Sequence, residues 1–155
     1  MSPELDLTFS RTVSSPVSHL WKGWTNPEVL KKWFCPLPWR TVACEIDLRP
    51  GGRFRTVMQG PNGERQEGEG VYLEVVPEKR LVWTNALVAG YRPAPAPETD
   101  LGFLFTAIVE FESKGDQTLY RATVLHRSEA ERDMHARMGF EQGWGIALQQ
   151  LVAIE

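Results

Sequence analysis

The chain has 155 residues, of which 42% are hydrophobic and 24% charged, and its formal net charge at pH 7 is −3. This length is usual for one domain, so we expect residues 1–155 to form a single domain. The negative charge argues against a nucleic-acid partner, because such proteins normally present a basic face. No stretch approaches the roughly 20 apolar residues that a membrane span requires, and the N-terminus lacks a signal-peptide pattern.

The first half of the chain predicts a strand, two short helices and then a meander of strands. Residues 5–13 alternate apolar and polar side chains, which is typical of a strand. Ser15-Pro16 and Asn26-Pro27 are start signals for two short helices. Period-two patterns and turn signals such as Gly60-Pro61-Asn62-Gly63 then predict further strands at 41–48, 53–58, 69–76, 81–85, 103–112 and 118–127.

A proline-rich segment, Ala89–Leu101, interrupts this series and should be an irregular connection. One interpretation is a solvated surface loop. The other is a lid at the edge of a cavity, because long loops in compact domains often serve binding sites.

The C-terminal stretch Ser128–Glu155 predicts one long amphipathic helix, around which the rest is organised. Ser128 and Glu131 form a capping box, and apolar residues then recur at spacings of three and four. Gly139 and Gly143 interrupt the pattern on one face. They indicate either close backbone packing against a neighbour, or a helix loosened at Gly139 so that its first part can move over a cavity.

This order of elements predicts an α+β fold. A curved antiparallel sheet should wrap around the long C-terminal helix, and the two short helices that follow the first strand should close one end. Six tryptophans and seven phenylalanines are many for this length. Large aromatic side chains can hold the helix away from the sheet and leave an internal cavity.

Several short segments, spread over most of the chain, resemble one known family. They are Arg11–Pro16, Trp21, Thr25–Glu28, Lys32–Phe34, Asp47–Phe54, Pro61–Gly63, Val75–Thr84, Gly143-Trp144, Leu148 and Leu151. In order and coverage they are similar to the START-like (SRPBCC) superfamily, in the branch of homologues of the activator of the heat-shock protein 90 ATPase. The resemblance implies the helix-grip fold and a hydrophobic cavity between the sheet and the terminal helix.

The resemblance implies less about activity. The family includes stress-related proteins of unknown ligand and binders of lipids or polyketides, and its wider branches include some cyclases and hydroxylase components. The heat-shock link comes from eukaryotic members with an additional N-terminal domain, for which this chain has no room. Fold-level similarity does not fix function.

The sequence gives little support for a metal site, a cofactor site or a catalytic nucleophile. His19, His126 and His135 lie far apart in the sequence, and Cys35 and Cys44 form no CxxC pair, so we expect no metal site. We also expect no cofactor, since Pro50–Arg53 lacks the lysine of a phosphate-binding loop. Two cysteines fit a reducing cytoplasm, where they behave as small apolar residues.

His126 is the one histidine that the pattern singles out. It shares strand parity with Tyr120, Ala122 and Val124, so it should point inward. It is either a hydrogen-bonded structural residue, or a cavity residue that orients a polar ligand group or moves a proton. Arg53, Arg55, Glu67 and Glu69 form either solvent-facing ion pairs or, with reversed parity, an inward arginine that holds a carboxylate.

Three functions remain open. The first is a binding protein for a small apolar molecule. The side chains that would line its cavity, or otherwise simply fill the core, are Trp33, Phe54, Met58, Leu73, Trp83, Met134, Met138 and Trp144. His126 would be the polar contact to the ligand. The second is a cyclase or hydrolase that uses His126 as acid and base. The third is a partner of heat-shock protein 90 that uses exposed aromatics such as Trp39. The sequence leaves a homodimer open.

Overall fold

The computed structural model of the chain describes residues 3–97 and 103–154. The seven strands of its main sheet are β1 (Asp6–Val13), β2 (Arg40–Ile46), β3 (Arg53–Gln59), β4 (Arg65–Val76), β5 (Arg80–Thr84), β8 (Phe105–Lys114) and β9 (Gln117–His126). A short ladder of β6 (Leu87–Val88) and β7 (Arg92–Pro93) lies in the connection between β5 and β8. The helices in the described residues are α1 (Val17–Thr25), α2 (Pro27–Leu30), α3 (Glu129–Arg137) and α4 (Phe140–Val152).

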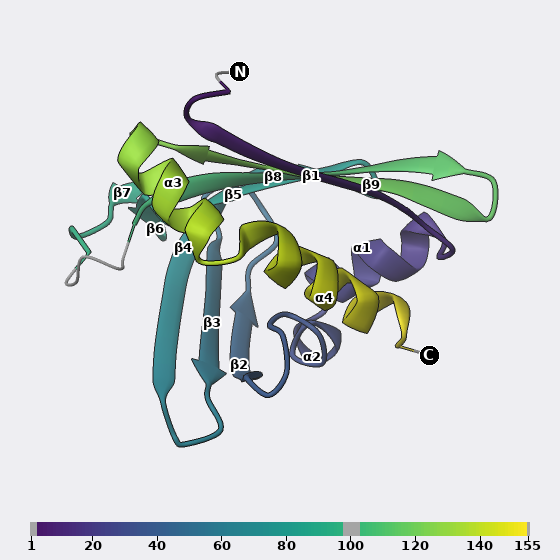
Figure 1. The fold of residues 1–155 in the computed structure, drawn as a ribbon, viewed down its shortest axis with the longest axis horizontal. Coiled ribbons are helices and arrows are strands. Elements are labelled where there is room, and N and C mark those ends of the chain that lie inside the picture. The colour runs from purple at the N-terminus through teal and green to yellow at the C-terminus, as the bar shows by residue number, and fades with distance from the viewer. Residues whose placement is uncertain (1–2, 98–102, 155) are drawn as a thin grey trace.

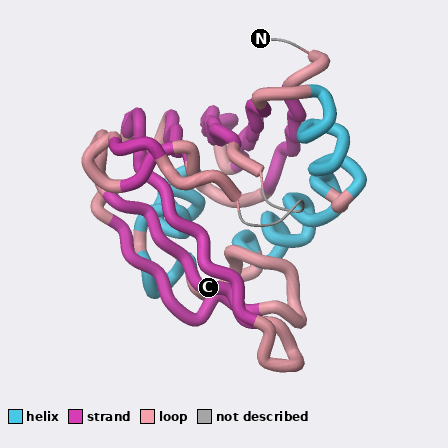
Figure 2. Tube along the Cα trace, turned by 90° about the vertical axis from the view of Figure 1, so that its left-hand side faces the viewer, coloured by secondary structure: helices cyan, strands magenta, loops and turns pink. Residues whose placement is uncertain are grey.

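The main sheet is antiparallel and strongly curved. Its strand order is β1-β9-β8-β5-β4-β3-β2, so the first strand pairs with the last and the meander forms the other half. Figure 1 shows β1, β8 and β9 running along the molecule while β2, β3 and β4 turn away from them, with α4 in the angle between. The tube in Figure 2 shows the same bend from the side. The predicted α+β helix-grip architecture is confirmed.

The core fills the space between the sheet, α1 and α4. Phe140, Ala147, Leu148 and Leu151 give α4 its buried face, as the stripe pattern predicted for this half of the helix. The buried indole of Trp24 on α1 donates a hydrogen bond from Nε1 to the hydroxyl of Tyr120 at 3.0 Å. Burial of these apolar and aromatic side chains supplies most of the driving force that holds the helices on the sheet.

The prediction of one long helix over Ser128–Glu155 is wrong, because the structure contains two helices. Ser128 caps α3 as expected, and its hydroxyl accepts from the backbone N–H of Glu131 at 3.2 Å. The chain then breaks at Gly139, whose φ of +90° lies in the left-handed region that favours glycine. The helix α3 buries none of its residues, so the apolar stripe does not extend through Met134 and Met138.

Gly139 and Gly143 do not serve close packing. A side chain at Gly143 would meet no atom within 4 Å, and at Gly139 only the side chain of Gln142 at 3.7 Å. Gly139 instead allows the change of direction between α3 and α4. Of the two interpretations, tight packing is therefore excluded at these two positions, and a break at Gly139 is observed.

Two local differences from the predicted elements bear on the site. The second short helix ends at Leu30, capped at its start by the side chain of Asn26, so Trp33 and Phe34 follow it in a turn. The pairing of β4 with β5 shifts between Tyr72 and Glu74, which indicates a β-bulge. The bulge interrupts the simple alternation on which the position of Leu73 was predicted. The end of the predicted loop, residues 98–101, lies outside the described residues.

Candidate functional site

A groove lies between the concave face of the sheet, the turn after α2, and the α3–α4 junction. It consists of two connected pockets of about 580 and 370 Å³. We name them the loop pocket, which reaches the proline-rich loop, and the helix pocket, which lies against α4. Their shared wall consists of Phe34, Met58, Gln66, Trp83, Phe105 and Met138.

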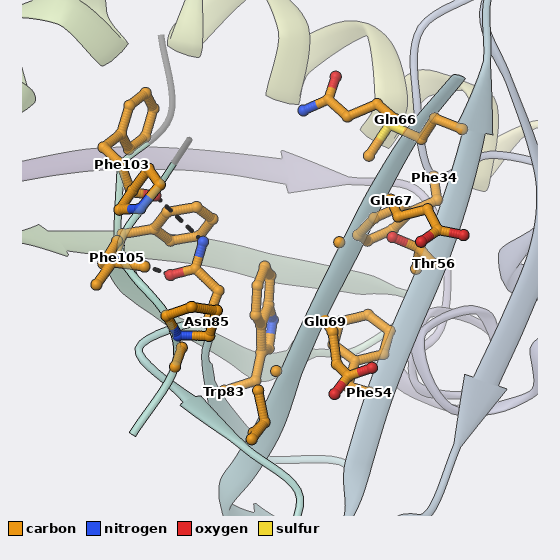
Figure 3. A pocket seen from close by; sticks show the side chains of 18 of the residues that line it. Phe34, Phe54, Thr56, Gln66, Glu67, Glu69, Trp83, Asn85, Phe103 and Phe105 are labelled. Atoms are coloured by element: carbon orange, nitrogen blue, oxygen red, sulfur yellow. Dashed lines mark hydrogen bonds between the residues drawn. The ribbon is translucent and has the colours of Figure 1, made fainter. Parts of the chain in front are cut away.

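The loop pocket is bordered by aromatic side chains from distant parts of the chain. Figure 3 shows Trp83 of β5 between Phe105 of β8 and Phe54 of β3, with Phe103 beyond Phe105. Thr56 lies on the same strand as Phe54. Ala94, Pro95 and Pro97 of the proline-rich loop complete the edge. The described part of this loop therefore borders the pocket, and its role as a lid stays a prediction.

The helix pocket is also largely aromatic. It adds Trp24, Trp33, Tyr120, His135, Phe140 and Trp144 to the shared wall. Trp33 Nε1 donates to the backbone oxygen of Gly23 at 3.0 Å, and the side chain of Gln150 donates to the oxygens of Trp33 and Cys35. The first bond joins the turn after α2 to α1, and the bonds from Gln150 join it to the last turn of α4, so α1 and α4 both hold this wall.

Glycines on β4 create room in the groove. Phe54, Thr56 and Met58 alternate on the inner face of β3, and they pair with Gly70, Gly68 and Gln66 of β4. A side chain at Gly70 would collide with the backbone oxygen of Thr84, so glycine is needed there. A side chain at Gly68 would meet only the hydroxyl oxygen of Thr56, at 3.4 Å. The missing side chain at residue 68 therefore leaves space in the loop pocket.

The structure brings together six of the nine residues that the sequence singled out. These are Trp33, Phe54, Met58, Trp83, Met138 and Trp144. Three do not line the pockets. Leu73 lies at the β4 bulge, Met134 lies on α3, which buries nothing, and His126 lies behind His135.

His126 points inward, as its parity predicted, but both of its ring nitrogens are engaged. Its Nδ1 lies 2.9 Å from the backbone oxygen of Leu5, and its Nε2 lies 2.9 Å from Nδ1 of His135. The carbonyl can only accept, so Nδ1 of His126 carries the proton, and Nε2 of a neutral His126 accepts from Nδ1 of His135. His126 is thus a structural residue that orients His135, while His135 borders the helix pocket.

His135 is held neutral by its surroundings. Burial, and to a smaller extent the neighbouring His126, together lower the pKa of its imidazole to about 4. The rings of Phe103, Phe105 and Phe140 pack around the imidazole of His135, with distances between ring centroids of 4.7, 5.7 and 5.2 Å. In this setting the unprotonated Nε2 of His135 is a hydrogen-bond acceptor at neutral pH.

The remaining polar candidates do not form a reactive site. Burial raises the pKa of the Cys35 thiol, and it raises that of Cys44 to about 11, so both thiols stay protonated at neutral pH. Both cysteines are free. Within residues 3–97 and 103–154, no group of three or more His, Cys, Asp or Glu side chains is placed to hold a metal ion.

The arginines of the β3–β4 hairpin follow the ion-pair interpretation. Arg55 contacts Glu67 at 2.7 Å and Glu45 at 3.5 Å, while Arg53 contacts Glu45 at 3.2 Å and Glu69 at 3.7 Å. Neither arginine lines either pocket. An inward arginine that binds a ligand carboxylate is therefore excluded at these positions.

Several lining residues were missed by the sequence reasoning. Phe34 and Phe105 belong to the shared wall, Phe103 to the loop pocket, and His135 to the helix pocket. The alternation of Phe105 with the buried Ala107 and Val109 was a usable signal for Phe105. No sequence signal placed His135, because its position depends on the break at Gly139.

Comparison with known proteins assigns the fold to a family. Residues 14–154 match the family described as "Activator of Hsp90 ATPase homolog 1-like protein". The chain belongs to this family. It is thus an AHSA1-like member of the START-like, or SRPBCC, superfamily, as its sequence motifs indicated. A comparison with curated proteins finds no match.

Solved structures agree with this assignment. A crystal structure of a protein from Nitrosomonas europaea is 45% identical in sequence, with a TM-score of 0.91 over 97% of this chain and 94% of that chain. An NMR structure from Arthrobacter aurescens is 22% identical, with a TM-score of 0.80 over 97% and 85%. An AHSA1-like protein from Aeromonas hydrophila is 19% identical, with a TM-score of 0.67 over 94% and 89%. The latter two show the shared fold alone.

Proposed function

We propose that this AHSA1-like chain binds a small, largely apolar molecule in the groove between its sheet and α4. The observation that carries this proposal is the groove's continuous aromatic wall, with about 580 Å³ in one pocket and 370 Å³ in the other. These volumes lie in the range of small-molecule sites, which are concave and mostly apolar. Transfer of apolar surface from water into such a wall contributes roughly 25 cal/mol per Å².

The family assignment supports the same function at a coarse level, because the fold family is compatible with binding small ligands. The groove is also positioned by rigid elements. Its shared wall combines residues of β3, β4, β5 and β8 with Phe34 and Met138 from the helical connections. The part of this wall carried by the strands is formed before a ligand binds, which reduces the entropy lost on binding.

The experiment is a fluorescence titration with N-phenyl-1-naphthylamine, an uncharged apolar probe that brightens in apolar surroundings. We expect saturable binding by the wild-type protein. The double variant Gly68→Leu/Gly143→Leu places a side chain in each pocket and should weaken binding by about tenfold or more, since each position has open space. Circular dichroism verifies that the variant is folded.

The matched control is Gln149→Leu, which adds the same side chain to α4 at an exposed position outside the groove. This variant should bind the probe as the wild type does. The proposal fails if the wild type binds no probe, or if the double variant binds it as tightly as the wild type.

The alternative functions find no specific support. His126 does not line the groove, so it could not act as an acid or base on a ligand there. Within the described residues no carboxylate is hydrogen-bonded to His135, so His135 has no acid–base partner either. Trp39 is half-buried rather than prominently exposed, which weakens it as an anchor for heat-shock protein 90. A stress-related role stays a prediction.

Other expectations from the sequence also stay predictions. They are the homodimer, the cytoplasmic location and the assignment of residues 1–155 to a single domain. Among the described helices, none has the length and apolar character to cross a membrane.

A further inference from the structure

The imidazole of His135, which lines the helix pocket, has one nitrogen without a partner in the described part of the chain. Its Nδ1 lies 2.9 Å from Nε2 of His126, whereas its own Nε2 makes no hydrogen bond to a described residue. This Nε2 is not sealed in the core. Within residues 3–97 and 103–154, the buried side-chain nitrogen and oxygen atoms without a partner belong to Tyr72, Trp83 and Glu131. A ligand or water can therefore reach Nε2 of His135.

The ring of His135 stands between His126 and the groove. His126 lines neither pocket, whereas His135 lines the helix pocket together with Phe105 and Phe140, whose rings it contacts. The two nitrogens of an imidazole lie on different edges of the ring, so the edge with Nε2 faces away from His126. Nε2 is thus the polar atom that this ring can offer to a ligand.

The order of donors and acceptors leaves this nitrogen unprotonated. The carbonyl of Leu5 accepts from Nδ1 of His126, so Nε2 of His126 accepts from Nδ1 of His135. Burial, and to a smaller extent His126, lower the pKa of His135 to about 4, so its ring is neutral at pH 7. A neutral imidazole with its proton on Nδ1 has a lone pair on Nε2, and a group that binds there must donate a hydrogen bond.

Most other polar side chains of the helix pocket are occupied, exposed or able only to donate. The hydroxyl of Tyr120 is buried and accepts from Nε1 of Trp24. The indole N–H of Trp144 can donate but cannot accept. The amide of Gln66 lies on an exposed stretch of β4. Nε2 of His135 is therefore the acceptor that a ligand meets against the aromatic wall of this pocket.

We propose that the ligand of the groove carries an uncharged hydroxyl or N–H group, and that this group donates a hydrogen bond to Nε2 of His135. The aromatic wall holds the apolar body of the ligand, and His135 positions it. Among the described residues no Asp, Glu, Lys or Arg lines the helix pocket, which suits an uncharged donor. This inference rests on the proposed function and narrows it to alcohols, phenols and uncharged N–H compounds.

The first test observes His135 directly in the wild-type protein. Long-range proton–nitrogen NMR spectra at pH 7 resolve the unprotonated ring nitrogens, whose resonance moves upfield when they accept a hydrogen bond. Saturation with 2-naphthol should move the Nε2 resonance of His135 upfield. Saturation with 2-methylnaphthalene, in which a methyl group replaces the hydroxyl, should move it much less.

The second test compares affinities. Displacement of N-phenyl-1-naphthylamine gives the dissociation constants of both compounds, and the measured ratio is that of 2-methylnaphthalene divided by that of 2-naphthol. In His135→Phe, which keeps a ring but removes the acceptor, this ratio should fall about 3- to 10-fold, the range for one neutral hydrogen bond. His19→Phe makes the same substitution outside both pockets and should leave the ratio as in the wild type.

The inference is overturned, while the proposed function stands, if both compounds bind but move the Nε2 resonance equally, or if His135→Phe leaves the ratio unchanged. The NMR test needs no variant, so it decides the matter even where His135→Phe does not fold. If the wild type binds neither these compounds nor N-phenyl-1-naphthylamine, both proposals are overturned.

Discussion

The imidazole rings of His126 and His135 share a hydrogen bond, with Nε2 of the first 2.9 Å from Nδ1 of the second. The carbonyl of Leu5 fixes the proton of His126 on Nδ1, so the order of donors and acceptors runs from His135 through His126 to the backbone that precedes β1. This chain of bonds connects α3, the end of β9 and the N-terminal segment. The bond between the rings requires an unprotonated Nε2 on His126, because a protonated ring nitrogen cannot accept.

Folding stability should therefore depend on pH. Burial and the neighbouring His126 together lower the pKa of His135 from an ordinary value of 6.5 to about 4, so between these values the unfolded chain binds more protons than the folded one. The contribution of His135 to the free energy of unfolding should be constant above pH 6.5 and should fall as the pH drops towards 4. We expect a loss of about 1–2 kcal/mol, less than the full linkage value because the ring is partly exposed.

Urea titrations at pH 7.0, 5.5 and 4.5 measure this loss. The comparison is with His135→Gln, which cannot titrate but has an amide N–H for His126. The variant should lose less stability than the wild type over the same pH interval. Equal losses of stability in the variant and the wild type would show that the His126–His135 pair does not contribute to the pH dependence.

The buried bond between Trp24 and Tyr120 gives a second prediction. Tyr120→Phe removes the hydroxyl and leaves the Trp24 N–H without its partner inside the core. We expect a loss of about 1–3 kcal/mol in the free energy of unfolding, which is the cost of an unsatisfied buried donor. Tyr91→Phe removes an exposed hydroxyl and serves as the control, with a change within about 0.5 kcal/mol. Similar effects in both variants would contradict this assignment.

The glycines of the α3–α4 segment should respond in opposite directions to alanine. Gly143 lies inside α4 with open space around it, so Gly143→Ala should stabilise the protein by about 0.5–1 kcal/mol. Gly139 has a φ of +90°, so Gly139→Ala should destabilise it by about 1–2 kcal/mol. Urea denaturation measures both changes. The same sign in both variants would argue against the break at Gly139.

The helix α3 should be less stable locally than α4. It buries no residue, while α4 buries four, and part of its attachment is the His135–His126 bond and a 3.5 Å bond from Arg132 to the oxygen of Asp6. Amide protons of residues 134–137 should exchange at least about tenfold faster than those of 148–151. Hydrogen exchange followed by NMR measures the two rates, and equal protection would show that α3 and α4 open as one unit.

Met138 gives a prediction about access to the groove. Its side chain is 59% exposed and borders both pockets at the α3–α4 junction. Met138→Trp should narrow the entrance and slow both association and dissociation of N-phenyl-1-naphthylamine several-fold in stopped-flow measurements. Met134→Trp, on α3 and outside the pocket lining, is the matched control. Unchanged rates in Met138→Trp would place the entrance elsewhere.

Local alternation predicted most of the fold. The inward positions of Phe54, Thr56 and Met58 follow from a period of two, because residues on one strand face depend only on parity. The sequence marked Gly139 as a weak point of the helix but did not predict that the helix ends there, because the apolar spacing continues across Gly139 while the helical backbone does not. Leu73 was misplaced because a bulge changes parity without a sequence signal.

The candidate site was less predictable than the fold. Its shared wall joins residues as distant as Phe34 and Met138, and their proximity depends on how the sheet curves. The unpaired Nε1 of Trp83 depends on which buried atoms the fold leaves without a partner, which composition and spacing do not report.

The strand order has a consequence for synthesis on the ribosome. Asp6 pairs with Leu125 and Val13 with Thr118, so β1 has no neighbour until nearly the entire polypeptide has been translated. At roughly 5–20 residues per second, this strand waits for seconds with its backbone groups free. Closure of the sheet by β9 is thus a late step with a large loop to close, which favours slow folding.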